Sequence, residues 1–209
     1  MPDLLAATSN PHKLDELRAI FEPLGIRVLG LADVPGGPFP EPVEDGETFE
    51  ANARLKAVAY ARLTGRICLA DDSGLEVDAL NGTPGVHSAY YAGASGARAE
   101  RDARNNAKLL AALDRVPDDR RGARFVCCMC LADPGGNVLA VSRGTYEGRI
   151  AHSPRGTNGF GYDPLLILPD GRTSAELSEH EKNACSHRGA AARAIVSGLL
   201  SALATPSKS

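Results

Sequence analysis

The chain has 209 residues, of which 43% are hydrophobic and 23% are charged, a composition typical of one large globular domain. Its net charge of -3 excludes the basic surface that would hold a nucleic-acid backbone, and no run approaches the roughly 18 apolar residues of a membrane-spanning helix. The first residues also lack the basic segment of a secretory signal, so we expect a cytosolic protein with neither nucleic acid nor membrane as a partner.

The first part of the chain alternates predicted strands and helices. Asn10 and Pro11 have the spacing of a helix N-cap followed by proline at the first helical position, and apolar residues then recur at helical spacing. The predicted elements are a strand at Leu4 to Ala7, a helix at Pro11 to Leu24, a strand at Ile26 to Leu29, a helix at Thr48 to Leu63 and a strand at Ile67 to Ala70.

The second part combines helices with a hairpin. A turn-forming cluster, Asp133 to Asn137, separates two apolar runs and predicts a β-hairpin, and Ser178 and Glu181 have capping-box spacing. The predicted elements are a helix at Glu100 to Leu113, strands at Arg124 to Ala132 and Val138 to Tyr146, and an Ala-rich helix at Arg188 to Leu203. We therefore expect an α/β protein with a mixed sheet, forming one domain over residues 1–203 with a disordered tail at 204–209.

The chain has five cysteines, and three of them fall within one apolar run, Phe125 to Leu131. Zinc sites pair CxxC spacings or add nearby histidines, and neither pattern occurs here. We interpret Cys127, Cys128 and Cys130 as small buried hydrophobic residues.

A first group of polar residues, Thr8-Ser9-Asn10-Pro11-His12-Lys13, joins the first predicted strand to the first helix. The N–H groups at the start of a helix attract anions, and Lys13 would add a full positive charge beside them. The alternative is an ordinary capped helix with a solvated lysine.

A second group contains carboxylates and one lysine. Glu44 precedes the helix on which Thr48, Asn52 and Lys56 recur every four residues, and Asp71-Asp72-Ser73 ends an apolar run. Successive side chains of an extended segment point to opposite faces, so Asp71 and Asp72 are expected in different environments. One of them and Glu44 would suit magnesium, which takes one or two protein carboxylates together with phosphate oxygens. The alternatives are a solvated polar stripe and an ordinary turn at the two aspartates.

A third group lies near the C-terminus. The glycine-rich stretch Gly156 to Pro164 permits close backbone approach, and Phe160 and Tyr162 could present a flat face to a base. Lys182, His187 and Arg188 supply donors, although the same residues would also suit a solvated helix edge. The spacing of the glycines is not that of a dinucleotide fingerprint.

Taken together, these segments resemble the non-canonical purine nucleoside triphosphate pyrophosphatases, the family that includes inosine triphosphatase. The resemblance follows nearly the whole chain in order. Its motifs are Ala7 to Lys13, Thr48 to Ala57, Ala70 to Leu80, Gly82 to Val86, Gly159 to Pro164 and Ser186 to Arg188.

The resemblance implies magnesium-dependent hydrolysis of ITP, dITP and XTP between the α and β phosphates, releasing the monophosphate and pyrophosphate. It also implies a homodimer, and an inosine-triphosphatase-like fold in which a long curved mixed sheet carries two lobes flanking a cleft. By position, Asp72 would be the general base and a metal ligand, and Glu44 the second metal ligand. The implied substrate contacts are Thr8, Ser9, Asn10, Pro11, His12, Lys13 and Lys56 for the phosphates, Ser73, and Phe160, Gly161, Tyr162, Asp163, Lys182, His187 and Arg188 for the nucleoside.

The implied base preference has a physical reason. Inosine and xanthosine carry a carbonyl at C6 where adenine carries an amine, so a buried donor such as Lys182 or Arg188 would be left unpaired by adenine, at a cost of about 1 to 3 kcal/mol. Two departures from the family pattern are Tyr90, where the family usually has arginine, and Asn158, which replaces a frequent glycine. Two alternatives stay open: a pyrophosphatase for other bases, such as modified pyrimidines, and a non-catalytic nucleotide sensor.

Overall fold

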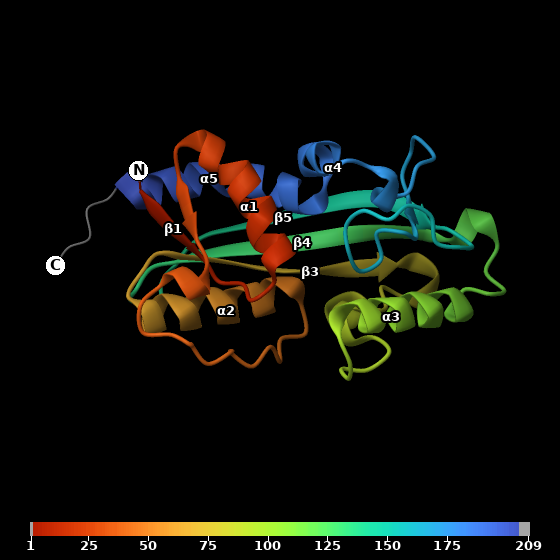
Figure 1. Ribbon diagram of the computed structural model, residues 1–209, viewed down its shortest axis with the longest axis horizontal. Helices are drawn as coiled ribbons and strands as arrows, with labels where there is room; N and C mark the ends of the chain where they lie inside the picture. The colour runs from red at the N-terminus through yellow and green to blue at the C-terminus, as the bar shows by residue number, and fades with distance from the viewer. Residues whose placement is uncertain (1, 205–209) are drawn as a thin grey trace. The chain divides into compact units, whose positions relative to one another are not determined.

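The computed structural model describes residues 2–204, which contain a six-stranded mixed sheet and five α-helices within that range (Figure 1). The strands are β1 (Asp3–Ala6), β2 (Arg27–Leu29), β3 (Cys68–Val77), β4 (Gly122–Ala132), β5 (Val138–Ile150) and β6 (Leu166–Ile167). The helices are α1 (Pro11–Phe21), α2 (Phe49–Thr64), α3 (Arg98–Ala112), α4 (Glu179–Cys185) and α5 (His187–Ala204).

The sheet has the strand order β2-β1-β3-β4-β5-β6. Strand β1 pairs in parallel with β2 and β3, whereas β5 and β6 are antiparallel. Strands β4 and β5 are neighbours joined by the turn at 133–137, which the backbone N–H of Asp133 closes onto the carbonyl of Asn137 at 3.0 Å. So short a connection requires a hairpin. The predicted mixed α/β sheet and its hairpin are confirmed.

The chain divides into two compact units, and β3, β4 and β5 each contribute residues to both. The first unit consists of the chain up to Asp72, Cys127–Gly144 and the chain from Arg188 onward. The second unit consists of Ser73–Val126 and Thr145–His187. The single domain expected over residues 1–203 stays a prediction. Ala204, expected in the tail, is the last residue of α5, and residues 205–209 lie outside the described residues.

In the first unit, helices cover both faces of the sheet. Figure 1 shows α1 and α5 on one side of the strands and α2 on the other. On the side of α1 and α5, alternate residues of the strands, including Leu4, Leu69 and Cys127, pack against Leu17 of α1 and Ile195 of α5. This arrangement decides where each side chain of β3 points.

The second unit has its own apolar core. Leu75 and Val77 at the end of β3 pack with Leu109 of α3, with Phe125 of β4 and with Ile150 of β5. The core also includes Tyr162, which lies within the glycine-rich stretch, and Leu165, which directly follows it, so the loop carrying the expected nucleoside contacts is anchored to this unit.

Several element boundaries differ from the sequence-based expectation. Helix α1 ends at Phe21 and continues as a 3₁₀ turn at Glu22–Leu24, because Pro23 has no N–H to continue the α-helical bonds. Strand β5 reaches Ile150 rather than Tyr146. Strand β3 continues to Val77, so the interpretation of Asp71-Asp72-Ser73 as a strand end or turn is wrong.

The three cysteines of β4 are buried, as expected for small hydrophobic residues. Burial raises the pKa of the Cys130 thiol to about 11. Among the helices of residues 2–204, none combines the length and the hydropathy needed to cross a membrane.

Candidate active site

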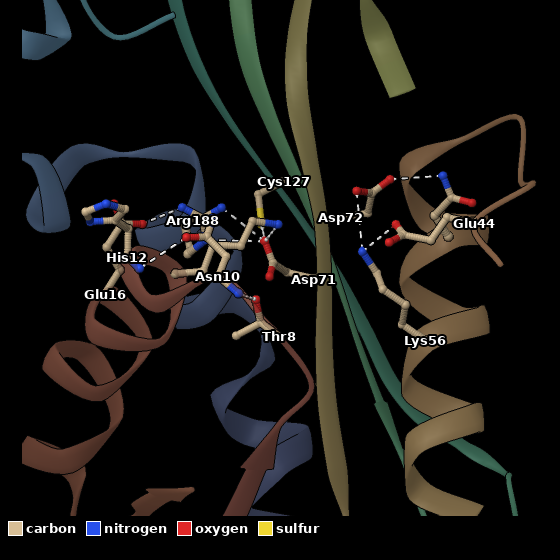
Figure 2. Close-up of polar contacts among 12 residues, drawn as sticks. Thr8, Asn10, His12, Glu16, Glu44, Lys56, Asp71, Asp72, Cys127 and Arg188 are labelled. Atoms are coloured by element: carbon tan, nitrogen blue, oxygen red, sulfur yellow. Dashed lines mark hydrogen bonds and ion pairs between the residues drawn. The ribbon is translucent and has the colours of Figure 1, made fainter. Parts of the chain in front are cut away.

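The two adjacent aspartates of β3 point to opposite faces of the strand (Figure 2). Asp71 shares its face with Leu69, two residues earlier, which packs against α1 and α5. Asp72 therefore points to the other face, which α2 covers (Figure 1). The expectation that the two carboxylates lie in different environments is confirmed.

On the α2 face, Asp72 and Glu44 share one lysine. The Nζ of Lys56 lies 2.6 Å from Oε2 of Glu44 and 3.6 Å from Oδ1 of Asp72. Burial alone would lower the pKa of Lys56, but the carboxylates of Asp72, Asp71 and Glu44 outweigh burial and raise this pKa above its ordinary value. Lys56 is therefore a firmly charged cation that holds two carboxylates near each other, and the polar stripe on α2 is not simply solvated.

On the opposite face, Asp71 is a buried carboxylate surrounded by cations. Its Oδ2 lies 3.0 Å from Nζ of Lys13 and 3.1 Å from Nη2 of Arg188. Burial raises the pKa of this carboxyl, but the positive charges of Lys13, Arg188 and Lys56 outweigh burial and hold the pKa well below its usual range. Arg188 also donates through Nη1 to Glu16, so all three of its guanidinium nitrogens donate to carboxylates.

The start of α1 carries the expected cap. The Asn10 side chain accepts a hydrogen bond from the backbone N–H of His12 at 3.1 Å, and Thr8 Oγ1 accepts one from the N–H of Asn10 at 3.1 Å. Ser9 donates to Glu41 at 3.3 Å. The capped turn presents Lys13 toward Asp71, so the lysine is not merely solvated.

In the second unit, Lys182 of α4 is held against the glycine-rich stretch. Its Nζ lies 2.7 Å from Oδ2 of Asp163, with the two side chains only 8% and 3% exposed. Asp163 also accepts hydrogen bonds from Ser174 and from the N–H of Phe160, both at 2.8 Å. Gly159, with φ of +77°, is needed here because a Cβ would fall 2.1 Å from the Asp163 carboxylate. The solvated helix edge is therefore wrong for Lys182.

Cations also lie beside the ring of Phe160. The Nζ of Lys182 and the guanidinium carbon of Arg98 are each 4.8 Å from the ring centroid, a separation typical of cation–π interactions. Helix α3 holds the next residue of this loop. Asp102 accepts from the backbone N–H of Gly161, and Asn106 donates to its carbonyl, both at 3.0 Å.

Two aromatic residues of the expected nucleoside site are largely buried. The Tyr162 side chain is 4% exposed, and its hydroxyl donates to the carbonyl of Ser88 at 2.9 Å. The expectation that its ring presents a flat face to a base is therefore wrong. His187 stacks on Phe125, with ring centroids 5.0 Å apart. The roles of Tyr162, His187 and Arg188 in nucleoside binding stay predictions.

The two departures from the family pattern each have neighbours that explain how they are accommodated. Tyr90 is 56% exposed, and the guanidinium of Arg101 lies 5.5 Å from its ring centroid, so a positive charge is still present beside this position. Asn158 donates through its side chain to the carbonyl of Leu177 at 2.9 Å.

The chemistry of Glu44 and Asp72 fits a hard divalent cation. Within residues 2–204 no group of three or more histidine, cysteine, aspartate or glutamate side chains forms a closed metal site. Magnesium needs only one or two protein carboxylates when phosphate oxygens and waters complete its shell. Because Glu44 and Asp72 already lie beside the same ammonium group, their oxygens are near enough to surround one positive centre.

Comparison with known proteins identifies the family of this chain. The profile of the Ham1 family matches residues 4–197. The chain belongs to the Ham1 family. The family resemblance inferred from the sequence motifs is thereby confirmed over residues 4–197.

Relatives and solved structures support the assignment to the Ham1 family. A protein of Anaeromyxobacter dehalogenans named dITP/XTP pyrophosphatase is 48% identical, over 97% of this chain and 98% of its own. One of Exiguobacterium with the same name is 52% identical, over 92% and 94%. The structure of a HAM1 protein from Coxiella burnetii superposes with a TM-score of 0.84 at 39% identity, covering 96% of this chain and 100% of that one. The expected fold class is confirmed.

Sequence reasoning did not assign a role in these sites to several residues that shape them. Asn52 contacts Asp72, Ser174 contacts Asp163, and Arg98 lies beside Phe160. Asn52 was recognisable only as a member of the polar stripe on α2. No local sequence signal marks Ser174 or Arg98, because their partners lie far away along the chain.

Proposed function

We propose that this Ham1 protein is a dITP/XTP pyrophosphatase that hydrolyses non-canonical purine nucleoside triphosphates to the monophosphate and pyrophosphate. The observation that carries the proposal is the grouping of Glu44, Lys56 and Asp72 on one face of β3. It combines two carboxylates that suit Mg²⁺ with a charged lysine that suits a phosphate. The names of the relatives that cover almost the whole chain supply the substrate class.

The phosphates would be bound by residues of the first unit. Lys13, at the start of α1, and Lys56, on α2, provide positive charge for a triphosphate that carries about four negative charges. Glu44 and Asp72 would hold Mg²⁺, which would neutralise charge on the phosphate oxygens. The lysines stabilise the charge that grows on the pyrophosphate leaving group as the bond between the α and β phosphates breaks.

Asp72 would act as the general base. Its carboxylate accepts a proton from the water that attacks the α phosphate, and Lys56 and Asn52 keep the carboxylate in place while it does so. Lys56 can contact both Asp72 and a phosphate oxygen, because an ammonium has three donors on a flexible stem.

The nucleoside would be bound by residues of the second unit. Lys182 gives one hydrogen bond to Asp163, and its ammonium can offer another to the C6 carbonyl of hypoxanthine or xanthine, while Phe160 offers a ring for stacking. Arg188 is a weaker candidate for reading the base, because its nitrogens already donate to Asp71 and Glu16. The homodimer implied by the family resemblance and the cytosolic location expected from the sequence stay predictions.

A substrate panel tests the activity directly. Purified protein with Mg²⁺ is incubated with ITP, dITP, XTP, ATP, GTP and dTTP, and monophosphate and pyrophosphate are measured. We expect pyrophosphate release from the first three, and none when Mg²⁺ is removed by a chelator. Release of orthophosphate alone would contradict the proposed bond cleavage. Faster turnover of dTTP would indicate a different base preference, and binding without turnover would indicate a nucleotide sensor.

The variant Lys182→Met tests base recognition. Loss of a charged donor to the base is expected to raise KM for ITP about tenfold, since a hydrogen bond to a charged group contributes about 1.5 to 3 kcal/mol, while kcat changes less because the phosphate contacts remain. The ratio of kcat/KM for ITP to kcat/KM for ATP should therefore fall. The matched control is Lys108→Met, which removes an exposed lysine of the same unit that donates to the carbonyl of Tyr91. A KM for ITP that matches the wild-type value would remove Lys182 from the base site.

A further inference from the structure

Asn52 is a buried amide that contacts both segments carrying the expected metal ligands. Its side chain is 3% exposed although it lies on a polar stripe of α2. Its Nδ2 donates to Oδ2 of Asp72 at 3.1 Å, and its Oδ1 accepts from the backbone N–H of Gly46 at 2.8 Å. Gly46 is two residues from Glu44 along the chain. A single side chain thus connects β3 with the segment that precedes α2.

The two hydrogen bonds determine which way the amide faces. Because the N–H of Gly46 can only donate, the oxygen of Asn52 must face Gly46, and the amino group must then face Asp72. The two oxygens of Asp72 consequently have different neighbours, with Oδ2 beside Asn52 and Oδ1 beside Lys56. The carboxylate cannot rotate without losing one of these contacts.

The fit between Asn52 and the segment of Glu44 is tight. A Cβ on Gly46 would lie 2.6 Å from Oδ1 of Asn52 and 2.8 Å from the Cβ of Ala51, so glycine is needed for the backbone to approach α2 this closely. Glu44 itself is anchored from the same helix, one turn later, by Lys56. Helix α2 thus supplies two contacts that bring Glu44 and Asp72 toward each other.

We propose that Asn52 is a positioning residue. It holds the Asp72 carboxylate and the segment of Glu44 in the relative position at which both carboxylates can bind one divalent cation. The proposal rests on the proposed metal site and adds a residue that does not itself touch the metal. Lys56 contacts the carboxylates through an ammonium on a flexible stem, whereas the amide of Asn52 makes directional hydrogen bonds to both Asp72 and Gly46. Hydrogen-bonding partners of this kind commonly change metal affinity by about 10- to 100-fold when they are removed.

The test measures metal binding without turnover. Mn²⁺ is titrated into the full-length protein in the absence of nucleotide, and free Mn²⁺ is followed by electron paramagnetic resonance. We expect Asn52→Ala to raise the Kd for Mn²⁺ about 10- to 100-fold, with a matching rise in the Mg²⁺ concentration that gives half-maximal pyrophosphate release. Gly46→Ala, which leaves Asn52 in place but pushes its partner away, should shift both values in the same direction.

The matched control is Asn105→Ala. Asn105 is also a buried amide, 2% exposed, but it connects Ala92 and Ser88 in the second unit. Its loss should lower the Tm without changing the Kd for Mn²⁺ by more than about twofold, since its hydrogen bonds contribute to folding and not to the metal ligands. Values for Asn52→Ala and Gly46→Ala within twofold of wild type would overturn the proposal. Failure of the wild-type protein to bind Mn²⁺ at all would overturn the metal site as well.

Discussion

Replacing Asp72 with asparagine is expected to remove most pyrophosphate release while the protein stays folded. The amide cannot accept the proton of the attacking water, and a general base contributes typically about 10²- to 10⁴-fold to a rate. Loss of a metal-binding carboxylate adds to the effect. The fold should persist because Lys56 keeps its closer contact with Glu44 at 2.6 Å, and the asparagine has the shape of the aspartate. The measurement is kcat for ITP at saturating Mg²⁺, alongside the circular dichroism spectrum and Tm.

A matched control for this variant is Asp78→Asn, six residues further along the chain. Asp78 is an exposed carboxylate that pairs with Arg124 at 2.8 Å, and exposed ion pairs contribute little to stability. Its replacement should leave kcat close to the wild-type value. Activity retained by Asp72→Asn would move the role of general base to another group. Loss of activity accompanied by loss of the folded spectrum would instead assign Asp72 a structural role.

Asp71 and Asp72 show which part of the site could be predicted from the sequence and which part could not. The two-residue period of a strand predicts that their side chains separate, whatever the rest of the fold. Which side chain joins which partners depends on the helices that cover each face of the sheet. Leu69 and Cys127 pack toward α1 and α5, so Asp71 must face that side, but this packing depends on segments far apart in the chain.

The most reliable predictions came from sequence patterns that involve only residues close together in the chain, such as helix caps. The predicted caps at Asn10 and Ser178 each depend on residues one to three positions apart, and the structure has a capping hydrogen bond at both. The extent of β3 was missed because adjacent carboxylates at the end of an apolar run normally indicate a turn. Strand β3 tolerates Asp71 only because Lys13 and Arg188, distant in sequence, neutralise it.

The ionic cluster of Asp71, Lys13 and Arg188 is expected to make a large contribution to stability. Asp71→Asn keeps the shape of the side chain but leaves two cations without their shared carboxylate. Breaking a buried ion pair by removing one partner typically costs about 3 to 5 kcal/mol, so we expect the free energy of unfolding to fall by that order. The measurement is urea unfolding at neutral pH. Asp3→Asn is the control, since its pair with Arg27 is partly exposed and its loss should cost much less.

The pH dependence of this loss separates charge from packing. Because the pKa of Asp71 is lowered in the folded protein, below the value of about 3.9 in the unfolded chain, the unfolded state binds more protons as the solution becomes acidic. The stabilisation from Asp71 is therefore complete above the unfolded pKa and is lost as pH falls below it. The difference in unfolding free energy between wild type and Asp71→Asn should narrow between about pH 5 and the lowest pH at which both still fold. A difference that stayed constant over this range would mean that folding does not shift the pKa of Asp71, and the loss in Asp71→Asn would then come from packing and hydrogen bonding rather than from charge.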